Sequence, residues 1–237
     1  FFLDEIHFLD NWSLQVKRYF DKKWPVKFIV SGSSASLIKK GAESLAGRTV
    51  EEVILPFNFK EYLSYKMNSA EINSIISRLT LDFNRIEPAD YLPLSPFKPE
   101  IRSSFEKYLT AGGFPNIIDI DNKLLIRKVL KEDIIDKVIY RDLVEYFGVK
   151  KPYVLEKLFL YLADHSSEIL NISSIANSLD LSRPHVEKYL NYLKSAYLVY
   201  TLMKYSSSLE KRLRSNEKAH LLDCGLISAF SPDNHDK

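Results

Sequence analysis

The chain has 237 residues, of which 46% are hydrophobic and 27% are charged, so it is long enough for two domains and too apolar to be disordered or fibrous. Its 33 basic and 31 acidic residues give a net charge of +2, which excludes a general attraction to polyanions and leaves nucleic-acid binding to a local patch. The single cysteine, Cys224, excludes an internal disulfide, and no apolar run approaches the ~20 residues of a membrane-spanning helix, so we expect a cytoplasmic protein without a membrane partner.

The first 60 residues alternate short apolar runs with helical patterns, which is typical of a parallel α/β sheet. The apolar runs predict buried strands over residues 1–3, 26–30 and 50–55. Helical spacing predicts helices over residues 10–20 and around residues 37–38. We therefore expect this segment to form part of an α/β domain.

After Pro56 the pattern becomes mainly helical. The expected helices cover residues 59–65, 72–81, 105–110, 123–147, 153–164, 173–179, 183–193 and 225–230, with short strands at 197–204 and 218–222. Residues 87–99 contain four prolines and are predicted to form a loop, whereas Gly148 is expected to cap the long helix before it. We place the domain boundaries at residues 1–60, 61–148 and 149–237.

The segment Phe1–Glu5 has the form of a Walker B motif, an apolar strand closed by two carboxylates. A buried strand holds such carboxylates rigidly at the sheet edge where open α/β sheets bind ligands. We predict that Asp4 holds Mg²⁺ through water, because Mg²⁺ keeps much of its hydration shell. Glu5 is then expected to orient and deprotonate the water that attacks the γ-phosphate of ATP. The alternative is a strand that merely ends in a polar turn.

Two further features follow this motif in the sequence. The second strand ends in Ser31-Gly32-Ser33, where a serine hydroxyl is able to cap the next helix. Arg48 lies just before the third strand, where its guanidinium is either an arginine finger for phosphate groups or a solvated surface charge. These residues and the two carboxylates make up the candidate site.

A series of short motifs runs in fixed order along nearly the whole chain. Its members are Phe1–His7, Asn11-Trp12, Ile29–Ser34, Leu45–Arg48, Leu55–Tyr62, Gly112–Pro115, Tyr140–Asp142 and Leu221–Leu226. The series resembles prokaryotic and archaeal AAA+ P-loop ATPases of the STAND-like branch, which are often found with a DUF4143 or similar C-terminal region. The resemblance implies ATP and Mg²⁺ as cofactors, a sensor-1 role for Ser33 or, as second choice, Ser31, and a sheet with the strand order 5-1-4-3-2.

The phosphate-binding loop of such ATPases is not found, because residues 1–237 contain no Gly-x-x-x-x-Gly-Lys-[Ser/Thr] sequence. In the implied order the three predicted strands are strands 3, 4 and 5, which form no continuous sheet without strands 1 and 2. We therefore expect roughly 60–100 residues, with the Walker A motif, upstream of Phe1. This fragment alone is expected to be inactive.

Residues 172–193 have the apolar spacing of a helix-turn-helix, and the β-like segment 197–204 would begin the wing of a winged helix. If this domain binds DNA, the exposed start of the second helix enters the major groove, with Arg183, His185 and Lys188 as contacts. The alternative is a module that packs on the ATPase or binds a protein, since Glu187 lies on the same helix and the net charge is small.

The sequence thus predicts an α/β fold, a partial P-loop NTPase with a parallel sheet, followed by a mostly α winged-helix domain. The expected function is Mg²⁺-dependent ATP hydrolysis that acts as a conformational switch coupled to the winged helix. The competing interpretation is a non-enzymatic DNA-binding or protein-interaction module whose ATPase half is degenerate or incomplete. A protein partner or a homo-oligomer is compatible with both.

Overall fold

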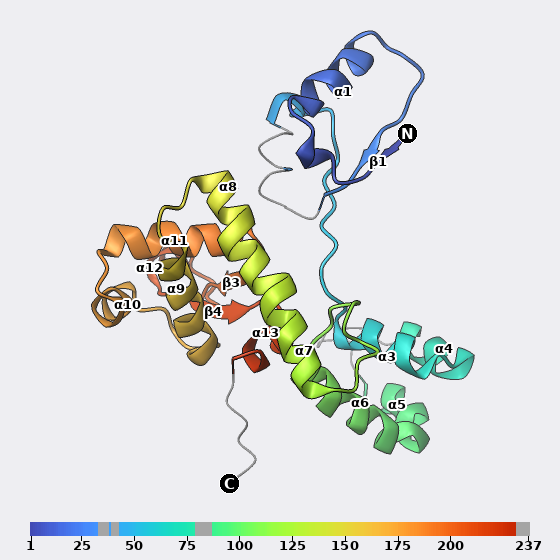
Figure 1. Ribbon diagram of the computed structural model, residues 1–237. Coiled ribbons are helices and arrows are strands. Elements are labelled where there is room, and N and C mark those ends of the chain that lie inside the picture. Colours follow the sequence, from blue (N-terminus) through green and yellow to red (C-terminus); the bar gives the residue numbers. More distant parts are fainter. Residues whose placement is uncertain (33–37, 39–42, 79–86, 231–237) are drawn as a thin grey trace. The chain divides into compact units, whose positions relative to one another are not determined.

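The computed structural model describes residues 1–32, 38, 43–78 and 87–230 (Figure 1). The chain divides into two compact units, one formed by Phe1–Val53 with Glu132–Leu222 and the other by Ile54–Lys131 with the segment that begins at Asp223. These units cut the chain at different places from the three predicted domains, which stay a prediction. Within the described ranges, every helix is too short or too polar to cross a lipid bilayer.

The N-terminal part of the first unit holds a small parallel sheet beside one helix. Strands β1 (Phe2–Leu3) and β2 (Ile29–Val30) pair in parallel, and helix α1 (Trp12–Asp21) lies between them in the sequence. Trp12 is buried together with Ile6 and Leu45, which come from short 3₁₀ turns on either side. A parallel pair needs such a crossover, because its strands run in the same direction. This small parallel sheet is compatible with the predicted α/β class.

Residues 50–55, which the apolar run predicts as a third strand, form no strand in the structure. In the described part of the chain the parallel sheet contains only β1 and β2. Val50 is 89% exposed and Ile54 is 97% exposed. A strand requires a neighbour that satisfies its backbone N–H and C=O groups, and an apolar run does not supply one. The prediction of this strand is therefore wrong for the structure described.

The rest of the first unit consists mainly of helices around an antiparallel strand pair. Its elements are α9 (Pro152–Asp164), α10 (Ile172–Leu179), α11 (Arg183–Ser195), β3 (Val199–Leu202), α12 (Leu209–Arg214) and β4 (Lys218–Leu221). Strands β3 and β4 pair antiparallel, and an isolated bridge joins Ile169 to Lys218. Phe159, Val186 and Leu193 are fully buried. The apolar spacing predicted α9, α10 and α11 correctly because it records the face that packs inward, whereas α12 was not predicted.

One long helix begins in the second unit and ends in the first (Figure 1). It comprises α7 (Lys123–Val129), two π-helical stretches (Leu130–Asp136 and Val138–Asp142) and α8 (Leu143–Phe147). The Asn122 side chain accepts a hydrogen bond from the Leu125 N–H at its start, and Gly148 ends it with a φ of +63°. This confirms the predicted helix over residues 123–147 and its cap, but the wider π-type turns were not predicted.

The second unit packs α3 (Phe59–Met67), α4 (Ala70–Arg78) and α6 (Lys98–Ala111) together, and α13 (Cys224–Ser228) contacts α6. A capping box starts α3, because the Asn58 and Glu61 side chains each accept a hydrogen bond from the other residue's backbone N–H. Leu63, Ile72 and Ile76 form the buried apolar cluster between these helices.

Residues 87–99, predicted as a loop, are largely helical. They form α5 (Pro88–Tyr91), a 3₁₀ segment (Leu92–Phe97) and the first turn of α6. Proline lacks the N–H that a helix interior needs, but the first turn of a helix leaves its N–H groups unpaired anyway. A series of short helices therefore accommodates the prolines that favoured a loop.

Candidate functional site

The parallel pairing of β1 and β2 brings Asp4 and Ser31 together. Leu3 lies opposite Val30, so the next residue of each strand leaves the sheet at the same edge. The Ser31 hydroxyl donates a hydrogen bond to the Asp4 carboxylate. The backbone fixes the same junction, because the Ser31 N–H donates to the Leu3 oxygen over 2.9 Å and the Ile6 N–H donates to the Ser31 oxygen over 3.0 Å. Two predicted site residues are thus in direct contact at the carboxyl ends of adjacent strands.

Glu5 occupies the first position after this junction, in a left-handed conformation with a φ of +48°. A left-handed backbone costs a non-glycine residue about 1 kcal/mol or more, and such positions occur often at functional sites. The residue is half-buried and precedes the 3₁₀ turn Ile6–Phe8. Asp4 and Glu5 therefore project from a turn and not from a continuing strand, so the side chains need not alternate between the two faces of a sheet.

The other two candidates of this site are Ser33 and Arg48. Ser33, the first choice for the sensor-1 position, lies outside the described residues. Arg48 lies against α1, where its guanidinium is 3.6 Å from the Asp21 carboxylate and 5.5 Å from the centre of the Phe20 ring. Arg48 forms neither a hydrogen bond nor an ion pair with Asp4 in the structure. The structure thus joins Asp4 with Ser31 and does not bring Arg48 to them.

The three residues predicted to contact DNA are exposed on α11. Arg183, His185 and Lys188 are exposed, whereas Val186 and Leu190 of the same helix are buried. His185 Nδ1 lies 2.8 Å from the Ser182 hydroxyl, and the Lys188 ammonium group lies 5.7 Å from the centre of the Tyr192 ring. These side chains are exposed as predicted, and their role as DNA contacts stays a prediction.

A buried junction between Gly112-Gly113 and Asp223 in the second unit was not predicted, although both segments belong to motifs of the resemblance. Asp223 is only 4% exposed. One of its carboxylate oxygens accepts the Gly113 N–H and the other accepts the Gly225 N–H, each over 2.8 Å. The Cys224 thiol donates to the Tyr108 oxygen over 3.1 Å. Two sequence features mark the junction: a glycine pair after a helix and Asp-Cys-Gly after a strand. Neither feature indicates that the two segments contact each other.

The electrostatics of this junction are those of a buried structural contact. Burial raises the pKa of Asp223 above its usual range, although the N–H groups of Gly113 and Gly225 act in the opposite direction. Burial, and then the nearby Asp223 charge, raise the pKa of Cys224 to about 11. A thiol with so high a pKa is a poor nucleophile near neutral pH. The junction therefore holds segments together and has no activated group.

Comparison with known proteins divides the chain into two matches. Residues 1–63 match an AAA domain, which supports nucleotide binding of the P-loop ATPase type. Residues 102–237 match the domain of unknown function DUF8612, whereas the resemblance in the sequence suggested DUF4143. No solved structure matches the chain.

Relatives of the chain are found in bacteria and archaea. An uncharacterized protein of Haemophilus influenzae is 29% identical over 95% of this chain and 51% of its own length. Two uncharacterized proteins of Methanocaldococcus jannaschii are 31% and 25% identical, over 94% and 96% of this chain and 46% and 47% of their own lengths. The chain thus spans about half the length of these relatives. Because the second family match covers more than half of its residues, the chain belongs to the DUF8612 family, with an AAA domain match at its N-terminal end.

Proposed function

We propose that residues 1–48 form part of an ATP site and that the full-length protein hydrolyses ATP. The observation that carries this proposal is the contact between Asp4 and Ser31 at the carboxyl ends of two parallel strands, within the region that matches an AAA domain. Open α/β sheets bind their ligands at this edge. Glu5, the next residue, lies in a left-handed turn and is the second carboxylate of the candidate site.

The donor set fits Mg²⁺. This ion prefers oxygen ligands, keeps several waters and is usually held by one or two carboxylates together with substrate phosphates. Asp4 is exposed, which leaves space for water between its carboxylate and the ion. Among the described residues no group of three or more His, Cys, Asp or Glu side chains converges on a metal site. When bound, Mg²⁺ would neutralise charge on the phosphate oxygens.

Each side chain of the proposed site has its own role in ATP hydrolysis. Asp4 would hold the hydrated ion, and the Ser31 hydroxyl keeps the Asp4 carboxylate in place. Glu5 would orient a water molecule and accept its proton as the water oxygen bonds to the γ-phosphorus, while the bond from that phosphorus to ADP breaks and ADP leaves. Arg48 contributes as an arginine finger after leaving Asp21, because a 3.6 Å ion pair that is partly exposed costs little to break. Ser33 remains the other sensor-1 candidate.

The exposed apolar surface of the small sheet supports a Walker A segment outside residues 1–237. Strands of parallel sheets are normally covered on both faces, but Phe2 is 82% exposed and Ile29 is 47% exposed. Ile54, in the segment without a strand partner, is 97% exposed. Additional strands with their helices would cover these side chains. The relatives have about twice the length of this chain, which leaves room for such a segment.

The order of elements in the first unit supports the proposal of a winged helix. Helix α9, the bridge at Ile169, helices α10 and α11, and strands β3 and β4 follow one another as helix, strand, two helices and a strand pair. We propose that ATP turnover changes the position of this module and so acts as a conformational switch. The module would then contact a protein partner or a second copy of the chain.

Nucleotide binding by the full-length protein tests the metal role. A fluorescent ATP analogue is titrated with and without Mg²⁺ into the parent, Asp4→Asn and Asp10→Asn, the last a control for an exposed carboxylate before α1. The parent and the control are expected to bind roughly tenfold or more tightly with Mg²⁺, and Asp4→Asn is expected to lose this dependence. An Asp4→Asn variant that keeps the full effect of Mg²⁺ would remove Asp4 from the site.

A further inference from the structure

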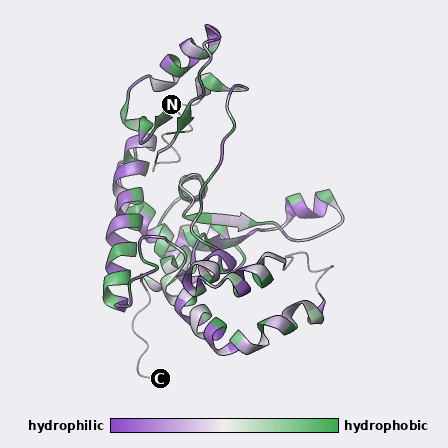
Figure 2. Ribbon diagram, turned by 90° about the vertical axis from the view of Figure 1, so that its right-hand side faces the viewer, coloured by the Kyte–Doolittle hydropathy of each residue, from purple (hydrophilic) through white to green (hydrophobic). Residues whose placement is uncertain are grey.

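The connection between β3 and β4 is unusually long for an antiparallel strand pair. The strands stay paired up to Leu202 and Lys218, so residues 203–217, here called the β3–β4 arm, join them. Most such connections contain about two to five residues. The arm carries helix α12, which projects at the end of the strand pair in Figure 2.

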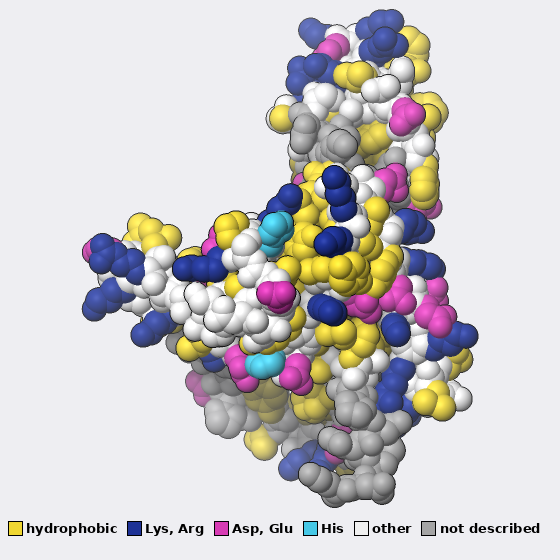
Figure 3. Space-filling model, turned by 60° about the vertical axis from the view of Figure 1, so that its left-hand side comes forward, with side chains coloured by type: hydrophobic (Ala, Val, Ile, Leu, Met, Phe, Trp, Pro, Cys, Tyr) yellow, Lys and Arg dark blue, Asp and Glu magenta, His cyan; other side chains and the backbone are white. Residues whose placement is uncertain are grey.

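The β3–β4 arm concentrates positive charge in a chain that is otherwise nearly balanced. Its basic residues outnumber its two acidic ones, and they are Lys204, Lys211, Arg212 and Arg214. Figure 3 shows several Lys and Arg side chains gathered on the arm that projects at the left. Both acidic residues already have basic partners, since Glu210 lies 2.7 Å from Arg214 and Glu217 lies 3.8 Å from Lys194. No ion pair within the described residues involves Lys204 or Lys211, so both charges are available to a ligand.

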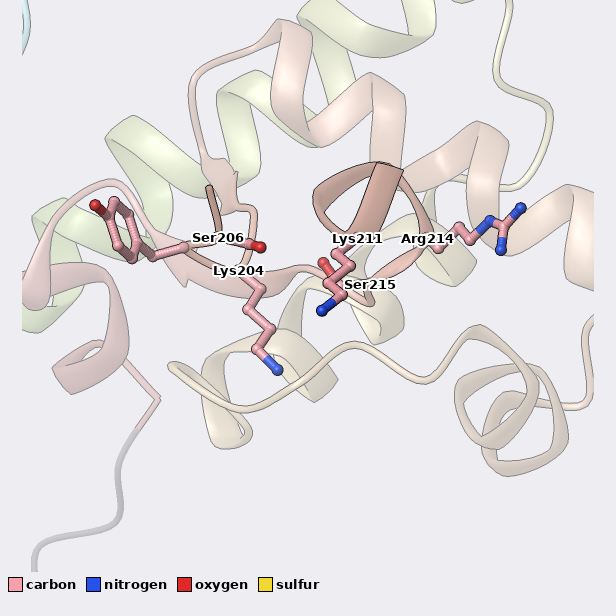
Figure 4. A pocket seen from close by; sticks show the side chains of 6 residues that line it. Lys204, Ser206, Lys211, Arg214 and Ser215 are labelled. Carbon is pink, nitrogen blue, oxygen red and sulfur yellow. The ribbon is translucent and has the colours of Figure 1, made fainter. Parts of the chain in front are cut away.

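An open pocket of about 470 Å³ lies on this arm and is lined by Lys204, Tyr205, Ser206, Lys211, Arg214 and Ser215. The ammonium ends of Lys204 and Lys211 lie on the same side of the arm, whereas Arg214 points away (Figure 4). The Ser206 oxygen accepts the Ser208 N–H over 3.2 Å, which leaves its own proton for a ligand. No carboxylate lines the pocket. Ammonium and hydroxyl donors without a carboxylate are groups that bind phosphate oxygens.

The same unit exposes two further kinds of group that can contact a nucleic acid. Tyr205 is 97% exposed, so its ring is packed against nothing in the described chain and is free to stack on a planar group. Helix α11, which leads into β3, exposes Arg183 and Lys188. We infer that the β3–β4 arm binds the phosphodiester backbone of a nucleic acid, with Lys204 and Lys211 as sequence-independent phosphate contacts. An acidic membrane surface would also attract an arm with the exposed side chains Leu209 and Leu213, and the test below separates the two.

Fluorescence anisotropy of the full-length protein with labelled duplexes of two unrelated sequences tests this inference. Lys204→Glu with Lys211→Glu is expected to weaken binding to both duplexes equally, by roughly tenfold or more at low salt. Replacing both lysines with alanine is expected to reduce the slope of log affinity against log salt by about 2, because each phosphate contact contributes about 0.9. Lys204→Arg with Lys211→Arg is expected to keep the affinity of the parent.

Lys22→Glu with Lys131→Glu is the matched control, since it changes two exposed lysines outside the arm and alters net charge by the same amount. Equal losses in this control and in the arm variant would show a general charge effect and overturn the inference. Binding of the parent to phosphatidylserine vesicles, with no binding to either duplex, would also overturn it in favour of a membrane contact. Circular dichroism of each variant verifies that these exposed substitutions leave the fold intact.

Discussion

Asp223 is a carboxylate whose environment opposes its ionisation. Its side chain is buried, and although two backbone N–H groups donate to it, burial dominates and the pKa lies above the usual range. The folded chain therefore holds the proton more tightly than the unfolded chain does. By linkage, the contribution of Asp223 to the free energy of unfolding is largest below the unfolded pKa, about 4, and falls as the pH rises through the folded pKa.

We therefore expect the free energy of unfolding of the parent to fall relative to that of Asp223→Asn as the pH rises from about 4. Urea unfolding of both proteins at several pH values measures this difference. Asp121→Asn, at a carboxylate that is 92% exposed, is the control in which the difference should change little. A constant difference between the parent and Asp223→Asn across the pH range would show that the pKa of Asp223 is not raised.

At the scale of elements, glycines allow the C-terminal end of α6 to lie close to two other segments, the backbone at Phe57 and helix α13. A Cβ on Gly113 would stand 1.9 Å from the Phe57 carbonyl oxygen, and one on Gly225 would stand 2.2 Å from the Ala111 oxygen. Phe57 also donates its N–H to the Gly113 oxygen over 2.8 Å. The close approach is therefore made between backbones, which cannot move aside as a side chain can.

Gly113→Ala is accordingly expected to lower the free energy of unfolding by about 3 kcal/mol or more, at the upper end of overpacking effects. Gly148→Ala is the comparison, because Gly148 has a φ of +63° but open space around it, so only the backbone strain of about 1 kcal/mol applies. Chemical denaturation measures both. Equal losses for the two variants would mean that the contact with Phe57 is not what requires glycine.

Among the elements, the helices were predicted better than the strands and the long-range contacts. Helix α11 and the long helix that ends at Gly148 were predicted correctly, because apolar spacing and caps are local signals. The strand at residues 50–55 was wrong because pairing depends on a partner elsewhere in the sheet. The contact of Gly113 with Asp223 joins residues 110 positions apart, a distance over which a single sequence carries no pairing signal.

The candidate site was also predicted only in part: the contact of Asp4 with Ser31 agrees with the strand pattern, whereas the position of Arg48 does not follow from it. An apolar strand that ends in Asp4 and a second one that ends in Ser31 lead to neighbouring positions whenever the strands are parallel neighbours, as they are here. Arg48 was placed by sequence order alone, and its contacts with Asp21 and Phe20 depend on how α1 packs. Side-chain partners of this kind follow from tertiary structure and are not encoded in a short motif.

At the scale of the whole molecule, the two family matches and the two compact units describe different divisions of the chain. The AAA match ends at residue 63 and the DUF8612 match begins at residue 102, whereas the long helix continues from one compact unit into the other.

The most direct test of the central proposal is ATP hydrolysis by the full-length protein, measured with ATP binding, for the parent, Glu5→Gln and Glu52→Gln. Glu52 is an exposed carboxylate outside the site and serves as the control. We predict that Glu5→Gln binds ATP like the parent but turns it over roughly a hundredfold or more slowly, the usual effect of losing a general base, while Glu52→Gln is unaffected. Hydrolysis by Glu5→Gln at the rate of the parent, or a parent that binds no ATP, would contradict the proposal.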